Sequence, residues 1–194
     1  MPTWDNLNEA FQYLRTYISQ KKQDRFSLSE IDLALVSNFK GGNASVVEPL
    51  NDLRKKLTAY TSALVKLDHV FGGLPLRDIP IQQLAAVQEL ARAFLQLTKT
   101  PETAIKGFGP ANASALLAAH FPDTLPVIDR LVLSGADIEH TRNNQGQVVN
   151  IEGHYPILIA KCHEALIASP QMSLRELDKH WFERGQLQNK VQHV

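Results

Sequence analysis

The stretch from Ile105 to Val132, IKGFGPANASALLAAHFPDTLPVIDRLV, contains the residues best suited to chemistry. Gly107 and Gly109 flank Phe108, and glycine adopts positive φ without a Cβ clash, so the pair allows a tight reversal between two helices. The helix that follows the turn begins with unpaired N–H groups and a partial positive charge, which together form a seat for a phosphate. A lone carboxylate, Asp129, follows an apolar run farther along.

These residues resemble the helix-hairpin-helix of the DNA glycosylase superfamily. That family has the pattern hydrophobic-Pro-Gly-x-Gly-x-x-x-Ala, followed by a helix, a loop and an aspartate preceded by apolar residues. Gly107, Gly109 and Ala113 match the hairpin, although Lys106 stands where the family usually has proline. Asp129 falls on the family's catalytic aspartate, at the separation from the hairpin found in endonuclease III-like members. The similarity covers about one sixth of the chain.

The resemblance implies a DNA-phosphate-binding set that consists of Lys106, Gly107, Phe108, Gly109 and Ala111. Backbone N–H groups from Phe108 to Ala111 would bind the phosphate, and Lys106 would add a charge-assisted contact. Carbonyl groups of the turn would offer a site to a monovalent cation. The alternative is a plain turn between two helices, since Gly-x-Gly also connects helices in ordinary bundles. The register of the hairpin with the distant aspartate favours the DNA-binding interpretation.

Ala111 marks a departure from the family, because the lyase members carry a Schiff-base lysine at this position. β-Lyase chemistry needs an amine nucleophile, so we do not expect it here. Members without the lysine cleave the base with an activated water. Ala111 therefore fits a monofunctional glycosylase, and it fits a protein without activity equally well.

The resemblance assigns Asp129 as the catalytic residue. When an N-glycosidic bond breaks, positive charge builds on the sugar, and one carboxylate can stabilise that charge and orient or deprotonate a water. Asp129 could instead cap the helix that begins at Arg130, and the two roles do not exclude each other. Pairing with Arg130 would hold Asp129 ionised but could also block the site.

Two functions follow as hypotheses. The first is a monofunctional DNA glycosylase-like enzyme of base excision repair that binds double-stranded DNA. The second is a non-catalytic helix-hairpin-helix protein that serves as a binding or scaffold module. The damaged base, the choice between DNA and RNA, and the oligomeric state stay open. Phe39, Phe71 and Trp181 could stack on an extruded base, with core packing as the alternative for each.

The composition limits these functions. The 194 residues carry 20 basic and 20 acidic side chains, so DNA binding would depend on a local patch rather than on net charge. Cys162 is the only cysteine, which rules out a four-cysteine iron–sulfur cluster and an intrachain disulfide. The histidines show no zinc-ligand spacing, so we expect no metal cofactor. No apolar run approaches membrane-spanning length, and we expect a soluble cytoplasmic protein, associated with the nucleoid if it binds DNA.

Apolar residues recur at steps of three and four along most of the chain, which predicts an all-α fold of about eight helices. We expect one helical domain over residues 1–185, as a single unit or as two lobes, with the helix-hairpin-helix at about 100–120 and a polar tail at 186–194. Helices are predicted over Trp4–Ile18, from a Ser27–Glu30 capping box to Val36, over Leu50–Phe71 and Pro80–Thr98, from Pro101, over Ala111–Ala119, after Asp129, over Tyr155–Ile167 and from a Ser173–Glu176 capping box to Gly185. Gly41-Gly42-Asn43 should form a turn or an anion-binding nest, and His140–Gln147 a loop or small hairpin with a strand at Val148–Ile151.

Overall fold

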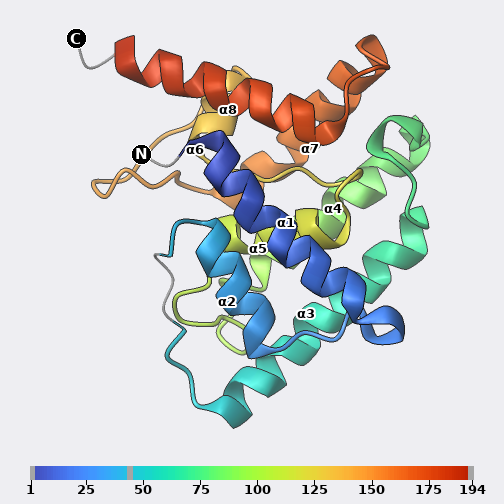
Figure 1. Ribbon diagram of the computed structural model, residues 1–194, viewed down its shortest axis with the longest axis vertical. Coiled ribbons are helices and arrows are strands. Elements are labelled where there is room, and N and C mark those ends of the chain that lie inside the picture. Colours follow the sequence, from blue (N-terminus) through green and yellow to red (C-terminus); the bar gives the residue numbers. More distant parts are fainter. Residues whose placement is uncertain (1–2, 43–45, 192–194) are drawn as a thin grey trace.

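The computed structural model describes residues 3–42 and 46–191. Within these residues the chain forms eight α-helices and no β-strand, which confirms the all-α prediction (Figure 1). The helices are α1 (Trp4–Gln20), α2 (Glu30–Phe39), α3 (Leu50–Phe71), α4 (Ile81–Gln96), α5 (Pro110–His120), α6 (Arg130–Gly135), α7 (Ile151–Ala168) and α8 (Leu174–Val191).

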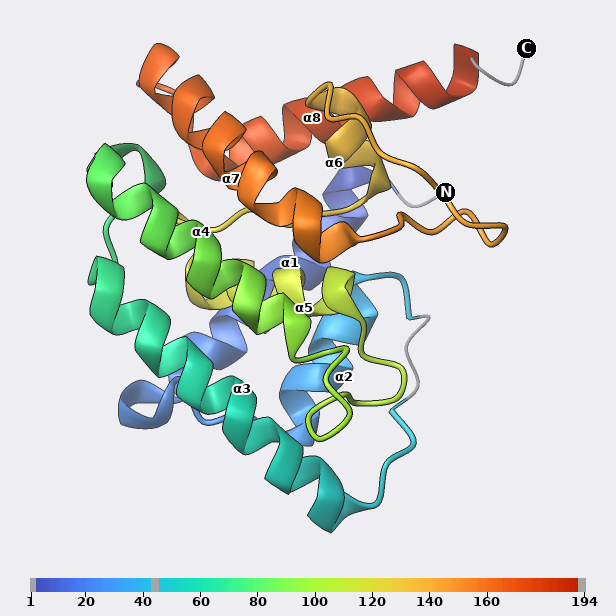
Figure 2. The same ribbon diagram turned by 180° about the vertical axis from the view of Figure 1, so that it is seen from behind.

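Helix α5 lies at the centre of the molecule in both views (Figures 1 and 2). It packs against α1, α2, α4 and α7, and every residue from Ala113 to His120 is buried. A helix that is apolar or small all round can be covered on every side, and the alanines of α5 allow its neighbours to approach. Helix α8 runs along one end of the molecule and packs against α6.

The long helix α3 buries the continuous seam that the sequence predicts. Its buried residues are Leu53, Leu57, Tyr60, Leu64, Leu67 and Phe71. The seam packs inside the molecule, against α4 among others.

The start of α2 differs from the prediction. The capping box is formed by Ser29 and Asp32, not by Ser27 and Glu30, and the helix begins at Glu30. The Asp32 carboxylate accepts hydrogen bonds from the amide and hydroxyl of Ser29 at 2.8 and 2.9 Å. Ile31, in the first turn of α2, is 51% exposed and does not pack into the core. The turn after α2 has positive φ at Gly41 and Gly42, and Asn43 lies outside the described residues.

The short helix predicted from Pro101 is absent, and residues 101–103 form a turn. The Thr100 carbonyl accepts hydrogen bonds from the amides of Thr103 and Ala104, which closes one turn only. The chain then reverses between Ile105 and Phe108, where the amide of Phe108 donates to the carbonyl of Ile105 at 3.0 Å. Too few residues separate Thr100 from this reversal to propagate a helix. Helix α4 is therefore the helix that precedes the hairpin turn.

Gly185 does not end α8, and the predicted polar tail from Gln186 continues the helix to Val191. A Cβ at Gly185 would collide with the backbone carbonyl of Leu131, and a Cβ at Gly135 would collide with that of Trp181. These two glycines let α6 and α8 cross with their backbones in contact. Gly185 is thus a packing glycine and not a C-cap.

The predicted strand at Val148–Ile151 does not form. The loop before it makes a single bridge between Arg142 and Val148, and α7 begins at Ile151. The amide of Asn143 donates to the carbonyl of Gln147, so the loop is a short hairpin with one bridged pair.

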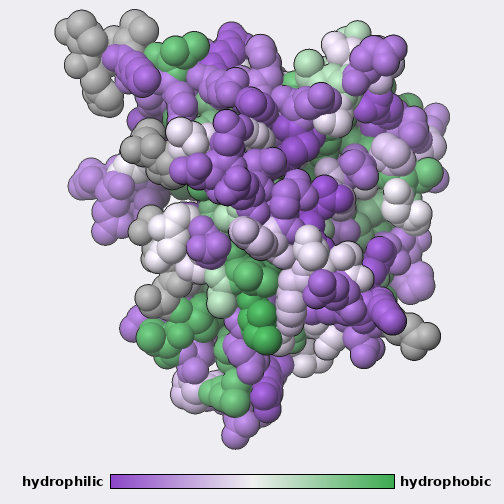
Figure 3. Space-filling view, viewed as in Figure 1, coloured by the Kyte–Doolittle hydropathy of each residue, from purple (hydrophilic) through white to green (hydrophobic). Residues whose placement is uncertain are grey.

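Polar and charged side chains cover most of the face that α1 crosses (Figure 3). Among the helices of the described residues, none combines the length and the apolar character that crossing a membrane requires.

Candidate functional site

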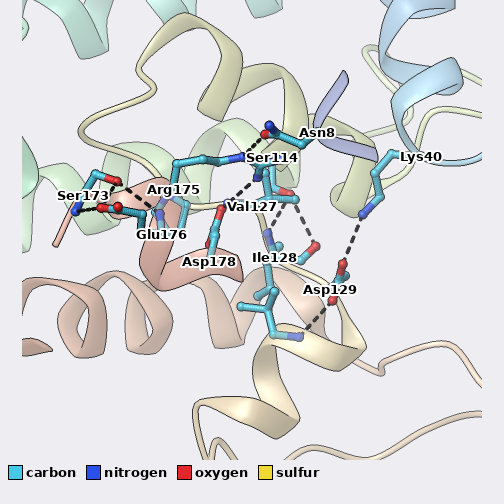
Figure 4. A network of polar contacts seen from close by, with 12 residues as sticks. Asn8, Lys40, Ser114, Val127, Ile128, Asp129, Ser173, Arg175, Glu176 and Asp178 are labelled. Atoms are coloured by element: carbon cyan, nitrogen blue, oxygen red, sulfur yellow. Dashed lines mark hydrogen bonds and ion pairs between the residues drawn. The ribbon is translucent and has the colours of Figure 1, made fainter. Parts of the chain in front are cut away.

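An extended buried run, residues 125–128, carries Asp129 through the middle of the molecule (Figure 4). Its buried backbone groups need partners, and three helices supply side chains for this purpose. Ser114 of α5 accepts a hydrogen bond from the amide of Ile128 at 3.1 Å, and Tyr155 of α7 donates to the carbonyl of Pro126 at 2.8 Å. Asp178 of α8 accepts a hydrogen bond from the amide of Val127 at 3.5 Å. The position of Asp129 is therefore fixed from three sides.

Asp129 uses its two carboxylate oxygens differently. Its Oδ1 accepts hydrogen bonds from the amides of Leu131 and Val132 at 2.8 and 2.9 Å, so the predicted capping role at the start of α6 is confirmed. Its Oδ2 lies 3.7 Å from Nζ of Lys40, and the side chain is 26% exposed. One oxygen is thus committed to the helix, while the other remains accessible.

The cation beside Asp129 is Lys40 from the end of α2, and the alternative in which Arg130 pairs with Asp129 is wrong. The Arg130 guanidinium forms no hydrogen bond or ion pair within residues 3–42 and 46–191. Arg130 is the first residue of α6, and a cation gains nothing from the positive end of a helix dipole.

Two hollows meet at Asp129. The inner cavity has a volume of about 410 Å³ and is lined by Trp4, Leu7, Phe39, Lys40, Gly41, Val127, Asp129, Arg130, Leu131, Val132, Arg175, Asp178 and Phe182. The outer groove has a volume of about 1050 Å³ and is lined by Lys40, Thr98, Lys99, Ile105, Gly107–Asn112, Asp129, Arg130, Asn143 and Gly146–Ile151. Lys40, Asp129 and Arg130 belong to both hollows, so Asp129 lies on their common boundary.

The hairpin turn forms one wall of the outer groove. Gly107 has φ of 87°, in the region that favours glycine, but Gly109 has φ of −94° and is extended, so positive φ is confirmed at Gly107 only. A Cβ at Gly109 would meet nothing within 4 Å. The amide side chain of Asn112 donates to the carbonyl of Gly107 at 3.2 Å and holds the turn.

Helix α5 begins in the outer groove without a side-chain cap from any described residue. The amides of Ala111 and Asn112 belong to its first turn, where N–H groups lack a partner within the helix. Phe108 is buried and meets Tyr60 edge to face at 5.8 Å, so only its backbone could contact a ligand. Lys106 is exposed beside the turn, and its backbone amide donates to Glu48 at 3.0 Å.

The outer groove carries a local excess of positive charge although the chain as a whole is neutral. Lys40, Lys99 and Arg130 line it against one carboxylate, Asp129. Lys99 is paired with Glu152 at 2.5 Å, which offsets part of this excess. Gly107, Phe108, Gly109 and Ala111 thus come together with Asp129 at one groove with a basic lining. Lys106, the remaining member of the predicted set, is not among the residues that line this groove.

The inner cavity contains functional candidates that the sequence interpretation missed, Arg175 and Asp178 of α8. Asp178 lies on the apolar stripe of that helix, four residues after Leu174 and three before Trp181. A carboxylate on a buried stripe is a signal that helical periodicity could have provided. Among the aromatic candidates, Phe39 lines the cavity, whereas Phe71 and Trp181 belong to the core.

Burial raises the pKa of Asp178 from 3.8 to about 7. The neighbouring charge of Arg175 and the hydrogen bond from the amide of Val127 act in the opposite direction, and the charge of Asp129 adds to the rise. Burial lowers the pKa of the Arg175 guanidinium, which Asp178 partly restores. The cavity therefore holds an acid that titrates near neutral pH.

No group of three or more His, Cys, Asp or Glu within the part of the chain that the structure describes could hold a metal ion. At the hairpin, the Gly107 carbonyl already accepts a hydrogen bond from Asn112. In comparisons with known proteins, no family model, no curated protein and no solved structure matches the chain.

Proposed function

We propose that the protein binds double-stranded DNA through the hairpin turn and hydrolyses the N-glycosidic bond of a damaged base, with Asp129 as the catalytic carboxylate. The observation that carries this proposal is the position of Asp129 on the boundary between a larger groove with a basic lining and a smaller pocket. A duplex backbone would follow the outer groove, and one nucleotide turned out of the stack would enter the inner cavity.

The geometry of Asp129 suits the chemistry. Two amide hydrogen bonds to Oδ1 fix the carboxylate plane, so Oδ2 needs no reorganisation before reaction. As the bond between C1′ and the base nitrogen breaks, its electron pair leaves with the base and C1′ becomes positive. Asp129 stabilises that charge, and a water attacks C1′ while its proton passes to the carboxylate.

The start of α5 supports the DNA-binding half of the proposal. Its uncapped amides and the open space beyond Gly109 offer a phosphate both hydrogen bonds and room. Lys99, Lys106 and Arg130 would add charge along the backbone of the DNA.

The alternative is a helix-hairpin-helix binding or scaffold protein without catalysis. The capping bonds of Asp129 favour it, because they give this residue a structural reason to be present. Ala111, in place of the lyase lysine, is compatible with both functions.

The test is a panel of duplexes, each with one damaged or mismatched base, assayed for binding at low and high salt and for release of the free base. Asp129→Asn is the informative variant, because asparagine caps helices about as well as aspartate and the fold is kept. Asp123→Asn, at an exposed carboxylate, is the matched control. Excision that is lost only in Asp129→Asn, with binding retained, supports the enzyme. Salt-sensitive binding without excision supports the alternative, and no binding at low salt contradicts both.

A further inference from the structure

Side chains of α3 fasten the backbone of the hairpin turn. Residues 101–109 lie between α4 and α5 and belong to no helix, so their polar backbone groups need partners from other elements. The Tyr60 hydroxyl of α3 donates to the carbonyl of Thr103 at 3.3 Å. Nζ of Lys56, one turn earlier on α3, donates to the carbonyl of Ala104 at 2.7 Å. The turn is thus attached to a helix that lies far from it along the chain.

Glu48 completes this attachment from the segment that leads into α3 and passes beside the turn (Figures 1 and 2). Its Oε1 accepts hydrogen bonds from the amide of Lys106 at 3.0 Å and from Nζ of Lys56 at 2.9 Å. Its Oε2 accepts from the same Nζ at 2.7 Å. The hydrogen bond from Lys56, followed by that from the Lys106 amide, lowers the pKa of the Glu48 carboxyl, so this group is ionised at neutral pH. One carboxylate therefore joins α3 to the hairpin.

The fastened backbone runs directly into the start of α5, where the proposed phosphate seat lies. Phe108, between the two glycines of the turn, packs edge to face against Tyr60 at 5.8 Å and ties this part to α3 as well. A helix N-terminus binds a phosphate best when its amides already point at one place, because ordering them on binding costs affinity. The attachment to α3 supplies that order before a ligand arrives.

The charge of Glu48 acts against this role, and its hydrogen bonds act in favour of it. Glu48 is an anion near a site proposed for another anion, although Lys56 offsets its charge. A unit charge about 10 Å from a phosphate changes the affinity roughly twofold in water. A hydrogen bond from the backbone to an ionised group is worth more than that, so the effect on the shape of the turn should exceed the effect of the charge.

We propose that Glu48 is a positioning residue for phosphate docking: together with Lys56, it holds the hairpin turn in the shape in which the first amides of α5 meet a phosphate. This inference rests on the proposed function for the statement that the phosphate belongs to DNA. It deepens that function, because it makes docking depend on an acid that is not among the residues lining the outer groove.

Two variants of Glu48 separate hydrogen bonding from charge, because both remove the same negative charge. Glu48→Gln keeps an oxygen that can accept from the Lys106 amide and from Lys56, as Oε1 does, whereas Glu48→Ala keeps none. Glu102→Ala, at an exposed acid on the turn that precedes the hairpin, is the control for a change of charge nearby. Binding of a labelled, undamaged duplex is measured by fluorescence anisotropy at low salt, and exchange of the Lys106 amide is measured by NMR.

We expect Glu48→Ala to raise the dissociation constant at least about fivefold, although it removes a negative charge. Exchange of the Lys106 amide should be at least about tenfold faster in this variant, while amides in the middle of α3 keep their wild-type protection and verify the fold. Glu48→Gln and Glu102→Ala should bind within about twofold of wild type or more tightly.

Glu48→Asp covers the case in which Glu48→Ala does not fold. It keeps the charge but withdraws the carboxylate by one methylene group, so it should also bind the duplex more weakly than wild type and exchange the Lys106 amide faster. Wild-type affinity in a folded Glu48→Asp protein would overturn the inference.

The inference is likewise overturned if Glu48→Ala binds the duplex as tightly as Glu48→Gln, or if its Lys106 amide exchanges at the wild-type rate. In these cases wild type still binds DNA, and the proposed function stands. A wild-type protein that does not bind the duplex at low salt gives a different result: it removes the proposed function and, with it, the docking role of Glu48.

Discussion

At the scale of single residues, the two glycines of the hairpin have different reasons to be glycine. Position 107 requires glycine for its backbone conformation, because a φ of 87° is strained for any other residue. Gly109 is extended, and a Cβ there would enter open space, so folding does not require glycine. A ligand that approaches the backbone at position 109 closely would require glycine there.

The two positions therefore predict opposite phenotypes. Gly109→Ala, at the N-cap of α5, should cost less than about 1 kcal/mol of stability and weaken DNA binding. Gly107→Ala should cost about 1 to 2 kcal/mol of stability. Denaturant unfolding and fluorescence anisotropy with a labelled duplex measure the two effects. A Gly109→Ala protein that binds DNA as wild type does would argue against phosphate docking at this turn.

At the scale of elements, the crossing of α6 and α8 holds the two hollows together. Gly135 and Gly185 allow the backbones to touch, and this brings Asp178 of α8 against the run that precedes Asp129. The positions of Asp129 and Asp178 thus depend on the close contact between α6 and α8.

Gly185→Ala tests this contact, because two effects of the change have opposite signs. Alanine has the higher helix propensity, by up to about 1 kcal/mol, but its Cβ would collide with the Leu131 carbonyl, which belongs to the backbone and cannot rotate away. We expect the collision to dominate and to destabilise the protein by about 2 kcal/mol or more, as measured by denaturant unfolding. Glu183→Ala, on the exposed side of α8, is the control. A more stable Gly185→Ala protein would show that the helices do not cross so closely.

The same elements show what the sequence could and could not predict. Helical periodicity found the seam of α3 and the central helix α5, and motif spacing placed the hairpin and Asp129 on one groove. Local patterns failed where tertiary contacts decide. Gly185 has the sequence context of a helix end, yet its role is set by Leu131, which is distant along the chain. Lys40 beside Asp129 and Asp178 beside Val127 are likewise long-range pairs that no local spacing encodes.

At the scale of the whole molecule, two buried titratable groups affect stability in opposite directions. Burial lowers the pKa of His120 to about 3, with Lys21 and Arg25 adding to the shift, and neither ring nitrogen has a partner among the described residues. The contribution of neutral His120 to the stability of the fold is present above about pH 6.5, the pKa of histidine in the unfolded chain. This contribution is lost as the pH falls toward 3. The pKa of Asp178 is raised, so its contribution is present below about 4 and is lost as the pH rises through about 7.

Asp178→Asn separates the two contributions. Its stability relative to wild type should rise from pH 5 to pH 8, by up to about 2.6 kcal/mol, because only wild type must keep an ionised buried carboxylate at the higher pH. The loss of stability on acidification, which His120 causes, should then be steeper than in wild type. Unfolding curves at four pH values between 5 and 8 measure this. Parallel pH profiles for the two proteins would mean that Asp178 is not the group that titrates.

The catalytic role of Asp129 is tested by the single-turnover rate of base release by Asp129→Asn, measured on the best substrate of the duplex panel together with the dissociation constant for the same DNA. We predict a rate at least about a hundredfold below wild type, a dissociation constant within about twofold, and no change in Asp123→Asn. Base release at the wild-type rate by Asp129→Asn would contradict the catalytic role of Asp129 and leave it as the N-cap of α6.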